Sequence, residues 1–318
     1  MLIKEILVVG LFASFLSASE EQWYQGKVEA LVKQWAPLVW LSEEEKFMPL
    51  SVEEFLNHMN IVNEAGKVLN HGKYLAMYYH SNFKKTYLVP KKPLDYLKGN
   101  ASSFLYGRNP KIHPTVPVYA VITYCKPISM TDLTKNLSYS EESELLPSFQ
   151  VTYWMFYPYN EGKEICFLGK VPAPLIFSKC FGHYRKLGNH IGDWEHLCMT
   201  QAKSVAQVPT YPAYIRLQGG HPVLFAAKGS HGVWSAPGEH EFIRVPRIRD
   251  KTDYGTPWKT WNSVEFHHFG RTMIQPWMSF EGKWGNPKTK CILLKKFGLC
   301  EYTEGPRGLL REHQDFYC

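Results

Sequence analysis

Phe149-Gln-Val-Thr-Tyr-Trp-Met-Phe-Tyr157 is a run of nine residues dominated by aromatic and β-branched side chains. Such side chains are enriched in strands because they pack well on a pleated, half-buried surface. From about residue 74 onward, similar runs alternate with clusters of Gly, Pro, Asn and Ser, which is typical of strands and turns. The other candidate strands are residues 74–80, 116–124, 194–200, 213–217, 223–227, 241–245 and 261–267.

Turn and helix signals around these strands indicate the fold class. Gln218-Gly-Gly-His221 lies between two candidate strands, and paired glycines supply the positive φ angles of a tight hairpin turn. Apolar residues recur at helical spacing over residues 28–35, and Ser51-Val-Glu-Glu54 forms a capping box ahead of a second short helix. Helical segments do not alternate with the strands, which disfavours a parallel doubly wound sheet. We therefore predict a mainly β protein, an antiparallel β-sandwich with short peripheral helices.

The first nineteen residues have the pattern of a secretory signal. Lys4 precedes an apolar run from Ile6 to Leu16, and small residues follow before Glu20. We therefore expect a secreted, extracellular protein whose mature chain starts at Glu20. No later stretch reaches the roughly 18 apolar residues of a membrane-spanning helix. Residues 20–287 are predicted to form one β-sandwich domain, and residues 288–318 a cysteine-containing C-terminal extension.

All seven cysteines lie after the predicted signal, and export favours disulfides over free thiols. Cys166 with Cys180, and Cys291 with Cys300, enclose short loops, although the spacing does not fix the pairing. An odd count leaves at least one cysteine that is either buried or available for a disulfide-linked dimer. The two N-glycan acceptor tripeptides, expected in surface loops, begin at Asn100 and Asn136.

Charge and missing motifs narrow the function class. The formal net charge of +7 is spread along the chain, and the basic residues near 288–296 are interrupted by Leu and Phe, which indicates a solvated face and no nucleic-acid partner. The sequence has no nucleophile elbow, phosphate-binding glycine loop, dinucleotide fingerprint or zinc-protease helix. These absences favour a binding protein over an enzyme. They leave open metal-assisted hydrolysis, which needs only a bound cation, a water and a base.

Gly188-Asn-His-Ile-Gly-Asp-Trp-Glu-His196 places an imidazole and two carboxylates within six positions. Alternate side chains of a strand share a face, so Asp193 and Glu195 should project together while Trp194 points away, and a bend would bring in His190. Two close carboxylates repel each other unless a cation or a shared proton intervenes. We therefore predict a divalent cation here, and oxygen ligands suit magnesium or calcium better than zinc. The alternatives are a metal-free hydrogen-bonded network and a catalytic acid–base site.

Five segments occur in an order that is similar to one known family. They are Trp35–Leu56, His190–His196, Ala226–Gly232, Asp250–Gly255 with Trp258, and Trp277–Phe280 followed by Gly282–Gly285. Together they resemble the family named after vacuolar protein sorting-associated protein 62, over most of residues 35–287. The resemblance adds His231, in Gly229-Ser-His-Gly232, as a candidate ligand-binding residue.

A more local pattern, Tyr153–Asn160 followed by the H-x-x-D-x-E cluster, resembles the core of secreted necrosis- and ethylene-inducing peptide-like proteins, which are cytolytic toxins. In those proteins an antiparallel β-sandwich carries a divalent cation that helps to engage sphingolipid head groups. The resemblance implies a cation site at Asn160, His190, Asp193 and Glu195. Asn160 stands where that family has an acidic ligand, and Ile191-Gly192 replaces its Arg-His.

These patterns lead to one leading function and two alternatives. We expect a secreted, divalent-cation-dependent protein that binds a polar lipid head group or a glycan, with peripheral membrane contact and toxin-like membrane activity as a further step. Trp194 and His231 are the expected ligand-binding residues, since Trp beside a cation suits a sugar or a lipid head group. The first alternative is a metal-dependent hydrolase with Glu195 or His190 as base. The second is an extracellular-matrix or secreted-fluid component in which the cation holds the fold.

Overall fold

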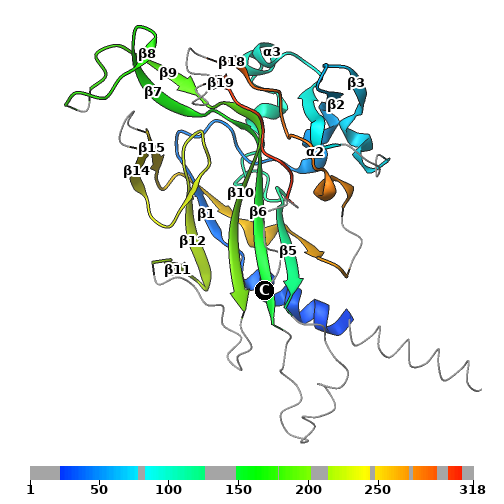
Figure 1. Ribbon diagram of the computed structural model, residues 1–318. Coiled ribbons are helices and arrows are strands. Elements are labelled where there is room, and N and C mark those ends of the chain that lie inside the picture. The colour runs from blue at the N-terminus through cyan, green and yellow to red at the C-terminus, as the bar shows by residue number, and fades with distance from the viewer. Residues whose placement is uncertain are drawn as a thin grey trace, which may run out of the picture.

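Strands form most of the regular structure, as the sequence predicts (Figure 1). The structure is a computed structural model that describes residues 22–77, 83–125, 148–177, 179–201, 214–243, 248–271, 275–291 and 300–309. The predicted signal, residues 1–19, and the predicted glycan acceptor Asn136 lie outside these ranges, whereas Asn100 is exposed. Within the described ranges, none of the helices combines the length and the apolar character that a membrane crossing requires.

The central sheet has the strand order β10-β6-β5-β17. Its strands are β5 (Val118–Tyr124), β6 (Phe149–Asn160), β10 (His190–Gln201) and β17 (Val264–His268). β6 pairs antiparallel with β5 and β10, whereas β17 runs parallel to β5. Nearly every residue of β6 is buried, because both faces of this sheet are covered. This burial explains the nearly continuous aromatic and β-branched sequence of β6.

A second sheet, ordered β11-β12-β1-β16, packs against one face of the central sheet. Its strands are β1 (Leu38–Leu41), β11 (Leu217–Gln218), β12 (His221–Ala226) and β16 (Thr256–Lys259), and β13 (Val233–Trp234) pairs with β12. Tyr153 and Met155 of β6 share one core cluster with Leu41 of β1 and Leu224 of β12. The predicted mainly β architecture is confirmed, although β1 and β12 run parallel.

The predicted glycine hairpin joins β11 to β12. Gln218 pairs with His221 across the turn. The φ angles of Gly219 and Gly220 are +60° and +87°, values that side chains with a Cβ rarely adopt. The sequence therefore located this turn correctly.

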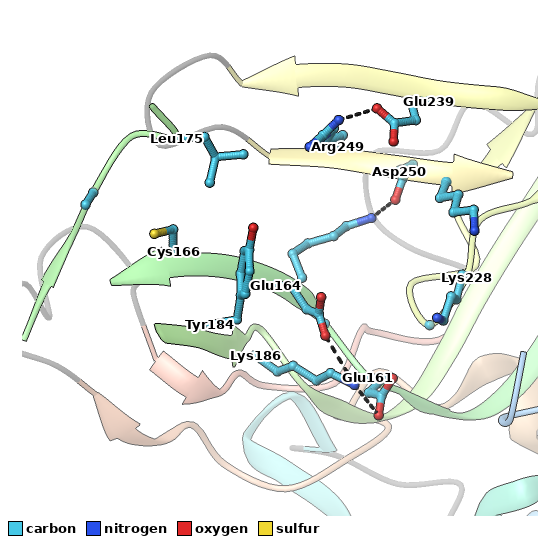
Figure 2. A pocket seen from close by; sticks show the side chains of 15 residues that line it. Glu161, Glu164, Cys166, Leu175, Tyr184, Lys186, Lys228, Glu239, Arg249 and Asp250 are labelled. Carbon is cyan, nitrogen blue, oxygen red and sulfur yellow. Dashed lines mark hydrogen bonds and ion pairs between the residues drawn. The ribbon is translucent and has the colours of Figure 1, made fainter. Parts of the chain in front are cut away.

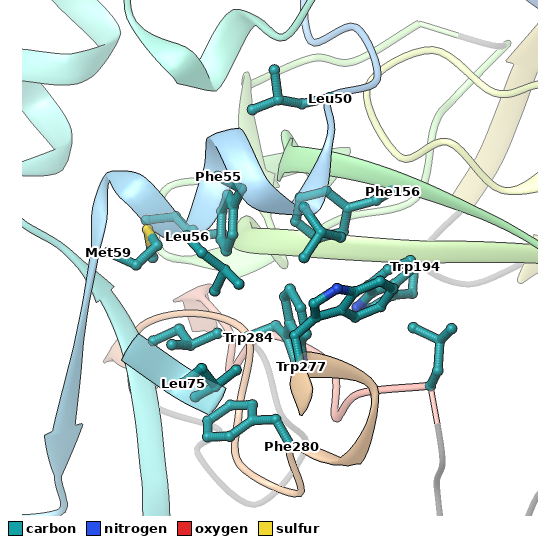
Figure 3. Close-up of a cluster of buried hydrophobic side chains, with 14 of the residues drawn as sticks. Leu50, Phe55, Leu56, Met59, Leu75, Phe156, Trp194, Trp277, Phe280 and Trp284 are labelled. Atoms are coloured by element: carbon teal, nitrogen blue, oxygen red, sulfur yellow. The ribbon is translucent and has the colours of Figure 1, made fainter. Parts of the chain in front are cut away.

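The opposite face of the central sheet is covered by an aromatic core (Figure 3). Helix α2 (Val52–Asn57) contributes Phe55, whose ring centroid lies 4.8 Å from that of Phe156 on β6. The Ser51 hydroxyl accepts a hydrogen bond from the Glu54 amide at 3.2 Å. The predicted capping interaction therefore starts this helix.

The remaining elements surround these two cores. Residues 22–35 are helical and add apolar side chains to the core between the two sheets. The further strands are β2 (Met59–Asn63), β3 (Val68–His71), β4 (Thr86–Pro90), β7 (Lys163–Leu168), β8 (Val171–Pro172), β9 (His183–Leu187), β14 (Gly238–Ile243), β15 (Ile248–Thr252), β18 (Thr289–Cys291) and β19 (Cys300–Tyr302). The further short helices are η1 (Gly72–Met77), η2 (Phe83–Lys85), α3 (Leu94–Gly99), η3 (Phe104–Tyr106), η4 (Thr260–Asn262) and η5 (Pro276–Ser279).

The strand predicted over residues 213–217 begins only at Leu217, and two other segments predicted as strands open in 3₁₀ helices. The segment predicted as a strand from residue 74 opens in the 3₁₀ helix η1, because a turn suffices to bury Leu75 while Tyr74 stays exposed. The strand predicted from Trp261 begins at Val264 instead, since the preceding residues form η4. The Thr260 hydroxyl in η4 donates to a buried carbonyl oxygen at 2.6 Å, which stabilises that turn.

Part of the predicted C-terminal extension, residues 288–318, belongs to the same fold. Residues 300–309 run beside the aromatic core. The Trp284 amide donates to the Pro306 carbonyl oxygen at 2.9 Å, and Leu309 is fully buried in that core. This segment therefore contributes to the stability of the sandwich.

Two disulfides join described cysteines to each other, Cys166–Cys180 and Cys291–Cys300. They are the two short-loop pairings that the sequence suggests. Cys198 is free and exposed. The disulfide-linked dimer stays a prediction, and Cys198 is the described residue that would form the bond.

Candidate functional site

The predicted site lies at one end of the central sheet, where His190 of β10 pairs with Asn160 of β6. Two loops reach this end: residues 42–50 follow β1, and residues 227–232 follow β12. The second loop carries His231, whose φ of +61° lies in the left-handed region. Its amide donates to a carbonyl oxygen of the same turn at 2.8 Å. A conformation that is costly for a residue other than glycine points to a specific role for this side chain.

His231 is fully buried and connects β10 to the loop after β1. Its Nδ1 lies 2.9 Å from Asp193 Oδ2. Its Nε2 lies 3.1 Å from the Phe47 carbonyl oxygen and 3.8 Å from Glu45 Oε2. Its ring stacks on that of Tyr157 with 3.9 Å between the centroids. Both ring nitrogens face acceptors, which is the arrangement of a protonated imidazole that donates twice.

The surrounding charges favour this protonated form. Burial makes the largest contribution and opposes protonation, but the charges and hydrogen bonds of Glu45 and Asp193 outweigh it and raise the pKa of His231 to about 10. Burial also works against the Asp193 carboxylate, yet the hydrogen bond from His231 holds the pKa of Asp193 below its usual value. The same balance lowers the pKa of Glu45. The group is therefore an imidazolium between two carboxylates.

Backbone amides complete the coordination of Glu45. Its Oε1 accepts hydrogen bonds from the Lys46 and Phe47 amides, both at 2.8 Å. Its Oε2 accepts from the Gly229 amide at 2.6 Å. One buried carboxylate thus fixes the loop after β1 to the loop after β12, and each donor lowers the cost of burying its charge.

Asn160 faces Asp193 with its amide nitrogen. Its Nδ2 donates to Asp193 Oδ2 at 2.9 Å, while its Oδ1 accepts from the Gly162 amide at 2.8 Å. A ligand to a hard cation would present its oxygen instead. His190 lies at the margin, with Nδ1 2.8 Å from the Gly192 carbonyl oxygen and Nε2 3.9 Å from Asp193 Oδ1.

Of the four predicted cation ligands, the structure brings Asn160 and Asp193 into contact and leaves His190 close by. Glu195 is half-buried and follows Asp193 by two positions on β10, so the two share a face. In the part of the chain that the structure describes, no group of three or more His, Cys, Asp or Glu side chains is arranged to hold a metal ion. The cation stays a prediction, and the positive charge seen beside Asp193 belongs to His231.

The two predicted ligand-binding residues are both inaccessible. Trp194 points to the opposite face of β10, as strand alternation predicts, and is 5% exposed in the aromatic core, stacked on Trp277 at 5.8 Å. A ligand-binding role for Trp194 does not fit this placement. His231 is fully buried, so its ring offers no surface for direct contact with a ligand.

A second polar group beside the first contains residues that the sequence did not assign to a site. Lys163 Nζ contacts both Ser230 Oγ and the Asp250 carboxylate. Ser230 Oγ donates to Asp250 Oδ1 at 2.7 Å, and Trp234 Nε1 donates to Asp250 Oδ2 at 3.1 Å. Burial lowers the pKa of Lys163 to about 8, against the opposing charges of nearby carboxylates. Because Ser230 precedes His231, the two polar groups share one turn.

An open pocket of about 260 Å³ adjoins this second group, between β7 and β9 on one side and the β14–β15 hairpin on the other (Figure 2). Lys186 Nζ lies 2.7 Å from Glu161 Oε1, and Arg249 pairs with Glu239. Five basic and four acidic side chains line the pocket: Lys163, Lys186, Lys228, Arg249 and Lys251, and Glu161, Glu164, Glu239 and Asp250. Charges of both signs on an open wall suit a polar, charged ligand.

The fold and the site define a mainly β protein in which a buried Asp–His–Glu network fixes two loops beside a charged pocket. No protein-family model and no solved structure matches the chain. The chain is 23% identical to the putative vacuolar protein sorting-associated protein TDA6 of Saccharomyces cerevisiae, over 91% of this chain and 68% of that protein. It is 22% identical to vacuolar protein sorting-associated protein 62 of the same yeast, over 92% of this chain and 67% of that protein. These similarities confirm the resemblance to vacuolar protein sorting-associated protein 62 that the sequence segments predict.

Because folded His231 is protonated, the free energy of unfolding should fall as the pH becomes alkaline. Its pKa is raised from about 6.5 in the unfolded chain to about 10, so its contribution is complete below pH 6.5 and is lost as the pH rises toward 10. Each pH unit in that window removes about 1.4 kcal/mol of stability per proton. The difference in unfolding free energy between the native chain and His231→Gln should therefore shrink from pH 7 to pH 9, as measured by urea unfolding. Lys163 titrates in the same window but is present in both proteins, and a constant difference would contradict the assignment.

Proposed function

We propose that this protein binds rather than turns over its ligand, and that its pocket takes a phosphate-bearing polar head group. The observation that carries the proposal is the convergence of five basic side chains on one open pocket. Lys163 and Lys186 come from β7 and β9, Arg249 and Lys251 from β15, and Lys228 from the loop after β12. Phosphate oxygens accept several charge-assisted hydrogen bonds at once, which suits donors that approach from several directions.

Two of the four acidic side chains of the pocket lie in accessible ion pairs that a phosphate can displace, whereas Asp250 is buried and stays paired with Lys163. Glu161 pairs with Lys186 and Glu239 pairs with Arg249, and all four side chains remain partly accessible. Solvent-exposed ion pairs of this kind contribute little to stability, typically about 0–1 kcal/mol. The singly charged phosphodiester of a head group can therefore exchange for a carboxylate at modest cost.

The buried network supports the proposal by fixing the wall of the pocket. The Gly229 amide donates to Glu45, and the Lys228 amide donates to the Lys251 carbonyl oxygen at 3.0 Å. Lys228 and Lys251 thus lie on backbone tied to the same buried charges, which reduces the ordering cost of binding. His231 has no exposed surface and is sealed from the pocket, which favours binding over acid–base turnover.

Calorimetric titration of the full chain with glycerophosphoserine tests the proposal. We expect saturable binding that the double variant Lys228→Glu with Lys251→Glu weakens about tenfold or more, because each hydrogen bond between charged groups contributes roughly 1.5–3 kcal/mol. Lys73→Glu reverses an exposed charge outside the pocket and should leave the affinity unchanged.

Two outcomes separate this proposal from the other expected functions. Loss of binding on addition of a chelator, with recovery in calcium, would support the cation site predicted at Asn160, His190, Asp193 and Glu195. Equal affinity for a neutral disaccharide and for glycerophosphoserine would count against phosphate recognition and in favour of a glycan. A secreted location also remains a proposal, which rests on the signal pattern at residues 1–19.

A further inference from the structure

Strands β7, β8 and β9 form a projection, the β-finger (residues 163–187), that extends away from the sandwich at the upper left of Figure 1. A disulfide ties β7 to the loop that precedes β9. The base of the β-finger has a small core of its own, made by Ile165, Phe167 and Leu187. The base therefore has its own packing and does not need the side chains of the tip to hold it together.

The tip of the β-finger exposes five large apolar side chains. The exposed fractions are 93% for Phe177, 68% for Phe181, 65% for Leu168 and for Val171, and 52% for Ile176. Single exposed apolar residues are normal on a soluble protein, but a group of this size on one projection marks an interaction surface.

Phe177 is held outward by a turn. Ile176 and Lys179 exchange two backbone hydrogen bonds, of 3.0 and 2.9 Å, and Phe177 has a φ of +48°. The left-handed region is costly for an aromatic residue, and a ring that is 93% exposed gains little from packing in return. A strained residue that does not stabilise its own chain indicates a function for the turn.

The charge around this tip has one sign. Between Ile165 and Leu187 the sequence contains four Lys or Arg residues and no Asp or Glu. Lys170 and Lys179 are exposed within the tip itself. Apolar side chains that enter the interfacial region, with cations beside them at head-group level, are complementary to an anionic bilayer.

We propose that the β-finger docks this protein on an anionic lipid bilayer. Phe177 and Phe181 insert at the interface, while Lys170 and Lys179 contact the head groups. This surface is distinct from the pocket and does not depend on the proposed head-group binding. Tyr184 links the two places, since it lines the pocket and is 53% exposed on β9. Docking by the tip therefore brings the pocket close to the bilayer surface.

Vesicle sedimentation of the full chain tests the docking. We expect binding to phosphatidylcholine vesicles that contain about 30% phosphatidylserine and little binding to pure phosphatidylcholine, with a loss at high salt because exposed charges are then screened. Phe177→Ala with Phe181→Ala should weaken binding about tenfold or more, since two apolar rings no longer leave water. Lys170→Glu with Lys179→Glu should weaken it by more than about twentyfold, because each cation near an anionic surface contributes roughly fivefold.

Ile112→Ala is the matched control, since Ile112 is 71% exposed outside the β-finger and its replacement should leave vesicle binding unchanged. Phe177→Ser alone tests the tip with the least risk to folding, and its melting temperature should equal that of the native chain. The tip variants should retain glycerophosphoserine binding, while Lys228→Glu with Lys251→Glu should lose it, so failure of the docking and failure of the pocket are distinguishable. Equal binding to neutral and anionic vesicles, unchanged binding in the tip variants, or no binding to either vesicle would overturn the proposal.

Discussion

Replacement of His231 by Leu should lower the free energy of unfolding by about 3–5 kcal/mol. Leu fills much of the volume of the imidazole but removes the positive charge between Asp193 and Glu45. Both carboxylates are buried, and His231 is what holds their pKa values below the usual range, so without it each carboxylate must either stay buried without a cation or take up a proton, and either outcome costs free energy. Urea unfolding at pH 7, followed by tryptophan fluorescence with the disulfides intact, measures the loss.

Two further variants separate the charge effect from a general effect of the substitution. His183→Leu replaces an exposed histidine on β9 and should change stability by less than about 0.5 kcal/mol. Asp193→Leu combined with His231→Leu removes one of the stranded carboxylates, so the double variant should lose less than the sum of the two single losses. Additive losses would mean that His231 and Asp193 do not act as an ion pair.

The strands could be predicted because burial favours an apolar side chain at nearly every position. β6 is covered on both faces, so aromatic and β-branched residues occupy almost its whole length. The strand can therefore be recognised from its own residues, without knowledge of the segments that pack on it. The glycine hairpin after β11 is similarly local, because two adjacent positive φ angles require glycine. Residues 74–77 show the limit of this reasoning, since a short apolar run fits a turn as well as a strand.

The sequence predicted Asp193 and, through the family resemblance, His231 as site residues, but it gave no indication of Glu45 or of the contacts among the three. The sequence argument predicted a metal cation beside Asp193, with a metal-free network as an alternative; the structure places the imidazolium of His231 there, and the metal ion stays a prediction. Glu45 ends the acidic run Glu43-Glu-Glu45, which is typical of a solvated surface, and its burial follows from contacts made elsewhere in the fold. Phe47 and His231, which are 184 residues apart in sequence, meet in this network. No periodicity or spacing in one sequence indicates such a contact.

Trp194 illustrates a different limit. Strand alternation correctly placed it on the face of β10 opposite to Asp193. The covering of that face by Trp277 and Trp284 depends on segments that follow β17, and the three indoles form part of one core (Figure 3). Periodicity thus indicates the face of a side chain but not whether that face meets solvent.

Replacement of Gly192 by Ala should cost about 3 kcal/mol or more. The φ of Gly192 is +66°, and a residue with a Cβ loses roughly 1–2 kcal/mol in this region. The added Cβ would also lie 2.1 Å from the Trp284 carbonyl oxygen, a backbone atom that cannot rotate away. Overpacking of this kind typically costs a further 1–3 kcal/mol. Because the Trp284 amide also bonds Pro306, the C-terminal segment would shift with it.

Gly188→Ala provides a matched control in the same stretch of chain. The φ of Gly188 is +83°, but a Cβ there would meet no atom within 4 Å. Its replacement should therefore cost only the conformational part, about 1–2 kcal/mol, when both variants are unfolded in urea under the same conditions. An equal loss in the two variants would mean that the backbone conformation alone requires glycine at position 192. A larger loss in Gly192→Ala would show that the site depends on the close approach of β10 to Trp284, and the near-ultraviolet circular dichroism of the tryptophan core should then change in that variant alone.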